Sequence, residues 1–153
     1  MKTKARRFVT HWAPVIAWMV LIFAGSSDAL SAEHTSRFLV PFLRWLDPHI
    51  SLAAMAQINF VVRKLGHLTE YAVLAALLWR ALRATAPSTS TLHIALITLV
   101  ASALFAILDE FHQSFVATRT ASGNDVFIDL CGAIIAIAVC VLLPARRRPT
   151  AKL

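Results

Sequence analysis

The chain has 153 residues, of which 58% are hydrophobic and only 15% are charged, and its mean hydropathy is +0.68. A soluble domain carries about 45–50% apolar and about 25% charged residues, so this composition excludes a soluble globular enzyme and a disordered tail. The net charge is +7, but the basic residues stand at the ends of apolar runs, which is typical of membrane proteins and not of nucleic-acid binding.

Four apolar runs divide the chain, at about 10–28, 60–82, 92–112 and 125–143. Each is close to the length of about 20 residues that a helix needs to cross a bilayer. The sequence therefore predicts an all-α integral membrane protein with one domain over 1–153, a bundle of four transmembrane helices. The basic amino terminus and the small residues at 29–32 leave a cleaved signal peptide as the alternative for the first run.

Lysine and arginine placement predicts the orientation of the spans. With four spans, ten of the fifteen basic residues fall at the two termini and in the loop between the second and third spans. The positive-inside rule then makes both termini cytoplasmic. Residues 37–46, apolar with Arg37 and Arg44 about two turns apart and with Trp45 as an anchor, predict a short interfacial helix between spans one and two.

Ionisable residues interrupt the second run, which begins with Lys64, His67, Glu70 and Tyr71. Helical periodicity places Lys64, His67 and Tyr71 on one face, with Glu70 beside it. Charged groups inside a span are costly and usually mark a functional site. The residue types leave three roles open for His67: general base, metal ligand or packing histidine.

Acids also stand where the third run ends and the fourth begins. Asp109 and Glu110 close the third run together with Gln113, and Asp125 and Asp129 open the fourth. The predicted topology brings both ends, and the start of the second run, to the outer leaflet, where we expect one polar pocket. Gly132 continues the stripe of Asp125 and Asp129, and small residues there would allow close helix packing.

The chemistry of these side chains suggests a role for each. Proton transfer is assigned to His67 with Glu110 or Asp109. Phosphate binding is assigned to Lys64 and Arg119. Asp125 would orient Arg119 or bind a cation, and Tyr71 and Gln113 would orient the substrate. A divalent cation, Ca²⁺ or Mg²⁺, would take oxygen ligands from Glu70 and Asp129.

Two sequence blocks carry a resemblance to a known family. Residues 63–71 read Arg-Lys-Leu-Gly-His-Leu-Thr-Glu-Tyr, and residues 109–116 read Asp-Glu-Phe-His-Gln-Ser-Phe-Val, followed by Arg119, Ser122, Asp125 and Gly132. In both blocks the chain resembles the VanZ-like (teicoplanin-resistance) family. The chain departs from the family pattern at Asp129, where an asparagine is common, and at 117–118, where Pro-Gly often precedes the arginine.

The resemblance implies a small polytopic protein of the bacterial cytoplasmic membrane, linked to the cell envelope. The family has been grouped with enzymes that act on lipid head groups, which agrees with the polar residues above. We therefore expect hydrolysis or head-group exchange on a phospholipid or a polyprenyl-phosphate lipid. The alternatives are an accessory protein that binds an envelope lipid or glycopeptide without chemistry, and a proton- or cation-coupled transporter. The sequence leaves the oligomeric state open, and antibiotic resistance is not carried over to this chain.

Overall fold

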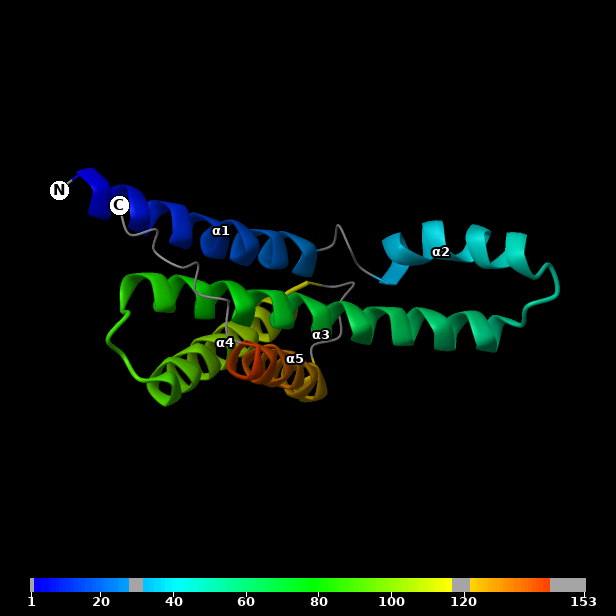
Figure 1. The fold of residues 1–153 in the computed structure, drawn as a ribbon. Coiled ribbons are helices and arrows are strands. Elements are labelled where there is room, and N and C mark those ends of the chain that lie inside the picture. Colours follow the sequence, from blue (N-terminus) through cyan, green and yellow to red (C-terminus); the bar gives the residue numbers. More distant parts are fainter. Residues whose placement is uncertain (1, 28–31, 117–121, 144–153) are drawn as a thin grey trace.

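The computed structural model describes residues 2–27, 32–116 and 122–143, and every regular element within them is an α-helix (Figure 1). This confirms the predicted all-α class. The helices are α1 (Lys2–Ser26), α2 (Ala32–Leu46), α3 (Leu52–Thr85), α4 (Thr91–Gln113) and α5 (Gly123–Leu142).

The distribution of side chains is that of a membrane protein. Large apolar side chains such as Leu104 and Phe111 of α4 and Phe127 of α5 are exposed, whereas Asp109 and Asp129 are buried. Three helical segments are long and apolar enough to span a membrane: Ala5–Ser26, Thr91–Gln113 and Gly123–Leu142. They correspond to the first, third and fourth predicted runs.

Helix α3 differs from the predicted second span. It has 34 residues, which corresponds to about 51 Å, well beyond the roughly 30 Å hydrocarbon core. It is not among the three segments apolar enough to span, because Arg63, Lys64, His67 and Glu70 dilute its hydropathy. The structure therefore confirms three candidate spans, and the fourth remains a proposal.

Helix α3 is the centre of the bundle and contacts α1, α2, α4 and α5. The apolar core forms where Val15 and Ile22 of α1 meet Tyr71 and Leu74 of α3 and Ala106 of α4. Ser51, Ser90 and Ser122 start α3, α4 and α5 as N-caps, each accepting a hydrogen bond from a backbone amide two or three residues on.

Helix α1 belongs to the bundle through polar contacts as well as apolar ones. The Trp18 indole donates to the backbone carbonyl of Glu70 at 2.9 Å, and the Ser26 hydroxyl donates to Asp109 at 2.8 Å. Helix α1 therefore supplies both core and polar contacts to the bundle.

Helix α2 is the short helix predicted between the first two runs, and it starts earlier than expected, at Ala32. It lies along the amino-terminal half of α3 as a helical hairpin (Figure 1), with Leu43 buried and Ser36 accepting a hydrogen bond from Asn59. Its opposite face exposes Phe38 and Trp45, the surface expected of an interfacial helix. Its position at a membrane surface stays a prediction.

Candidate functional site

Three buried side chains from three helices meet at the centre of the site. We call His67 of α3, Glu110 of α4 and Asp129 of α5 the central trio, because one nitrogen or oxygen of each lies within 4.8 Å of the others. His67 Nδ1 and Asp129 Oδ1 are 3.1 Å apart. The exposed fractions are 8% for His67, 7% for Glu110 and 0% for Asp129, so water reaches these groups poorly.

A cation lies beside the central trio. Lys64, one turn before His67, pairs with Asp125, one turn before Asp129. The Lys64 side chain is 24% exposed while that of Asp125 is 4% exposed, so the lysine forms the outer edge of the site. The ammonium also lies 5.0 Å from the centre of the Phe60 ring, a cation–π distance.

The two pairs run in the same order along both helices, since Lys64 meets Asp125 and His67 meets Asp129. Helices α3 and α5 are therefore parallel in this region, as the predicted topology requires. Spacings of three and four residues put both acids on one face of α5 and both bases on one face of α3.

A second group of polar side chains joins α1 to α4. The Ser26 hydroxyl donates to Asp109 Oδ2 at 2.8 Å, and the Gln113 amide donates to the same oxygen at 3.1 Å and to Ser26 Oγ at 3.4 Å. All three side chains are at most 5% exposed. The structure thus holds Asp109 in a hydrogen-bonded network with two neutral partners.

Ser26 is a site residue that the sequence analysis missed. It follows an apolar run as part of Gly25-Ser26-Ser27, where a serine is unremarkable. Only the packing of the end of α1 on the end of α4 reveals its partner. The sequence signal that exists is weak, because Ser26 is only a small polar residue near the end of an apolar run.

Glu110 connects the ends of two helices. Its Oε2 accepts a hydrogen bond from the backbone N–H of Ser122, the N-cap of α5, at 2.8 Å. Its Oε1 is buried without a hydrogen-bond partner among the described residues. One oxygen of Glu110 therefore positions the side chain, and the other is available to bind a proton, an ion or a ligand.

Two further carboxylate oxygens and one hydroxyl are also buried without a hydrogen-bond partner in the described ranges. Asp109 Oδ1 and Asp129 Oδ2 are buried and have no hydrogen-bond partner within the described part of the chain, and the Tyr71 hydroxyl is in the same state. Buried polar atoms without partners are costly. Such atoms are typical of a site that takes a proton, an ion or a ligand.

The remaining predicted residues lie in different positions. Tyr71 is fully buried in the apolar core and its ring lies 6.3 Å from that of Phe105. Glu70 is half-buried and does not belong to the central trio, so of the two predicted metal ligands only Asp129 does. Arg119 lies outside the described residues.

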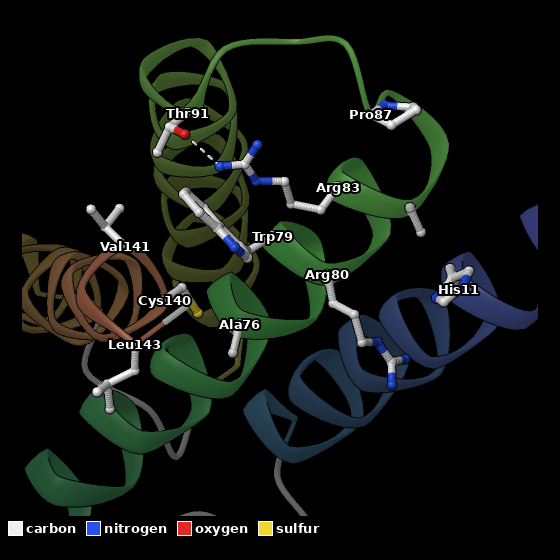
Figure 2. Close-up of a pocket in the computed structure, with 11 residues that line it drawn as sticks. His11, Ala76, Trp79, Arg80, Arg83, Pro87, Thr91, Cys140, Val141 and Leu143 are labelled. Carbon is white, nitrogen blue, oxygen red and sulfur yellow. Dashed lines mark hydrogen bonds between the residues drawn. The ribbon is translucent and has the colours of Figure 1, made fainter. Parts of the chain in front are cut away.

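A cavity of about 880 Å³ lies at the opposite end of the bundle. Figure 2 shows that Arg83 points toward Thr91 of α4, while Arg80 points toward α1. Because the two guanidinium groups diverge around α3, they do not surround a single anion. We therefore place the candidate site at the central trio and not in this cavity. The cavity is lined by His11, Ala76, Trp79, Arg80, Arg83, Ala84, Pro87, Thr91, Cys140, Val141 and Leu143.

Comparison with known proteins agrees with the resemblance seen in the sequence. No curated protein and no solved structure matches the chain. The family model described as VanZ/LLP1 matches residues 11–144, a range that contains every residue of the candidate site. The chain therefore belongs to the VanZ/LLP1 family.

Proposed function

We propose that this protein is an enzyme of the bacterial cytoplasmic membrane that hydrolyses or exchanges the phosphate head group of a lipid. The substrate would be a phospholipid or a polyprenyl-phosphate lipid. The observation that carries the proposal is the central trio, in which an imidazole and two buried carboxylates from three helices meet beside Lys64. Two of these carboxylate oxygens are buried without a partner among the described residues, which favours a functional site over a purely structural network.

Lys64 is suited to hold the lipid phosphate. It is the partly exposed member of an ion pair, and its partner Asp125 is buried. A phosphate that arrives from the lipid would find the ammonium already fixed in place by Asp125, which reduces the entropy lost on binding. Arg119, by its residue type, would supply a second, bidentate contact.

The central trio is suited to move protons. With Nδ1–H directed at Asp129, the His67 ring would present Nε2 as a base. It would take the proton of the attacking water in hydrolysis, or of the incoming alcohol in exchange. Glu110 in its acid form would return a proton to the leaving oxygen, which balances the reaction. The other roles left open for His67 are those of a metal ligand and of a packing histidine.

The geometry separates the two candidate carboxylic acids. Asp109 accepts hydrogen bonds from Ser26 and Gln113, whereas Glu110 keeps one oxygen without a partner next to His67. We assign the proton transfer to Glu110, and we regard Asp109 as a group that joins α1 to α4.

The proposal includes a membrane orientation. With α3 as a fourth span, the central trio would open to the outer leaflet and both termini would be cytoplasmic. The cavity with Arg80 and Arg83 would then lie on the cytoplasmic side, as the positive-inside rule expects.

The test is lipid mass spectrometry after incubation of total bacterial lipids with the reconstituted protein. We expect a released or exchanged head group with the wild type and at least a 100-fold slower reaction with Glu110→Gln, the loss typical of removing a general acid. Asp47→Asn is the matched control, since Asp47 is exposed in the turn between α2 and α3.

Each outcome has a clear meaning. Full activity of a folded Glu110→Gln variant would refute the role of Glu110. No product from the wild type, together with a lipid that co-purifies only with the wild type, would replace the enzyme with a non-catalytic lipid-binding protein. Monodisperse size-exclusion profiles would show that loss of activity is not loss of fold.

A further inference from the structure

The charges of the site do not balance among the described residues. Asp125 is paired with Lys64, but no lysine or arginine of the described ranges pairs with Glu110 or Asp129. Both carboxylates are more than nine-tenths buried, and each has one oxygen without a hydrogen-bond partner. Burying two carboxylates at one point is unfavourable unless a cation or a proton compensates them.

The geometry of the central trio is close to that of a metal site. Nitrogen and oxygen ligands lie about 2.0–2.2 Å from a bound Zn²⁺, so two of them are about 3–4 Å apart. His67 Nδ1 and Asp129 Oδ1 are 3.1 Å apart, and one atom of each member lies within 4.8 Å of the others. Small side-chain rotations would bring the three into coordination distance.

We propose that His67, Glu110 and Asp129 bind one divalent transition-metal ion. A dication would neutralise the two carboxylates and coordinate one oxygen of each. The imidazole decides the class of metal, because a ring nitrogen beside two carboxylates suits a first-row transition metal, best Zn²⁺, while Ca²⁺ and Mg²⁺ prefer all-oxygen sites. The sequence suggested Glu70 and Asp129 as ligands of Ca²⁺ or Mg²⁺. The proposed site keeps Asp129, has His67 and Glu110 in place of Glu70, and binds a transition metal instead.

Three protein ligands leave a coordination position open, which is the arrangement of catalytic and not of structural zinc sites. Lys64 stands one turn from His67 on the same face of α3, so a phosphate held there would lie next to the open position. With a metal bound, His67 and Glu110 would serve as its ligands in place of the proton-transfer roles proposed above. The metal site rests on geometry alone and stands whether or not the chain is an enzyme.

The surrounding structure would keep the ligands in place. The N–H of Ser122 holds Glu110 through Oε2 and leaves Oε1 toward the metal. Gly132 allows α5 to approach α3 closely one turn after Asp129. Such supporting contacts raise the affinity of metal sites by restricting the ligands.

Metal content is the direct test. The full-length protein, purified in detergent and stripped with a chelator, is dialysed separately against Zn²⁺, Mn²⁺, Ca²⁺ and Mg²⁺ and analysed by elemental mass spectrometry. We expect one Zn²⁺ or Mn²⁺ per chain and at least tenfold weaker binding in Glu110→Gln and Asp129→Asn. Asp47→Asn should bind as the wild type does.

A second readout is spectroscopic, and its main result comes from the wild type. In the Mn²⁺-loaded wild type, pulsed electron paramagnetic resonance should show nitrogen coupling from one imidazole, and His67→Gln should remove it. Absence of bound metal, absence of nitrogen coupling, or tighter binding of Ca²⁺ or Mg²⁺ than of Zn²⁺ and Mn²⁺ would each overturn the proposal. If the metal-free wild type converts lipids, the proposed function stands without the metal.

Discussion

Gly132 of α5 packs directly on the backbone of Leu68 in α3. A Cβ atom added at Gly132 would lie 3.0 Å from the Leu68 carbonyl carbon and closer still to its oxygen, and 3.2 Å from the backbone nitrogen of Ala72. This approach of two backbones sets the distance between α3 and α5. It thereby fixes the separation of His67 and Asp129, which precede Leu68 and Gly132 by one and three residues.

Gly132→Ala should therefore damage both fold and site. The added methyl group meets backbone atoms and not a flexible side chain, so the helices must separate. We expect a loss of about 1–3 kcal/mol of stability, the usual cost of overpacking. Fluorescence-detected size exclusion after heating would measure it as a lower midpoint temperature.

Gly66→Ala is the matched control, since nothing lies within 4 Å of a Cβ added at Gly66. Alanine favours a helix by up to about 1 kcal/mol over glycine. The variant should be as stable as the wild type or more stable. Equal destabilisation by both substitutions would show that close contact at Gly132 does not control the packing of α3 on α5.

The Lys64–Asp125 pair should couple energetically. In a double-mutant cycle with Lys64→Gln and Asp125→Asn, we expect an interaction energy of about 0.5–3 kcal/mol. Removing Lys64 alone should cost the most, because it leaves Asp125 buried and unpaired at 4% exposure. Additive effects in thermal unfolding would mean that the pair does not form in the membrane protein.

Asp109 and Glu110 should respond differently to loss of charge. Asp109→Asn keeps an oxygen that can accept from Ser26 and Gln113, so we expect changes in lipid turnover of less than tenfold. Glu110→Gln removes the transferable proton and should slow turnover by at least 100-fold. Comparable losses in both variants, measured by lipid mass spectrometry, would contradict the separate roles.

Ser26→Ala should loosen α1 from α4. The substitution removes a buried donor to Asp109 Oδ2, and a lost hydrogen bond of this kind costs about 1–3 kcal/mol. Ser114→Ala is the control, because its hydroxyl is exposed and bonds only within α4, to the carbonyl of Phe111. The expected result is a lower unfolding midpoint for Ser26→Ala alone.

The fourth span can be tested by labelling. Cys131 and Cys140 are first replaced by serine. Two variants of this background then carry one cysteine each, through Asp47→Cys in the turn before α3 or Ser88→Cys in the turn after it. If α3 crosses the bilayer, a membrane-impermeant thiol reagent added to intact cells should label only the cysteine at position 47. Labelling of both positions from the outside would rule out α3 as a span.

The amino-acid sequence was sufficient to predict the helical class and the three apolar segments that could span a membrane. Apolar runs of about 20 residues have few stable solutions in a bilayer, where the backbone must satisfy its own hydrogen bonds. For the same reason the runs at 92–112 and 125–143 match α4 and α5 within two residues. Ionisable side chains inside such runs are rare, so His67, Asp109, Glu110 and Asp129 stood out in the sequence.

Which of these residues are partners could be seen only in the folded chain. Periodicity places Asp109 and Glu110 side by side, but it cannot tell that Asp109 faces Ser26 of α1 while Glu110 faces His67 and α5. It also could not find Ser26, nor exclude Glu70 from the central trio. Which side chains pair between two helices depends on the distance between the helices and on the rotation of each helix about its own axis. Here one determinant of that packing is a contact without a side chain, the one between Gly132 and the backbone of α3.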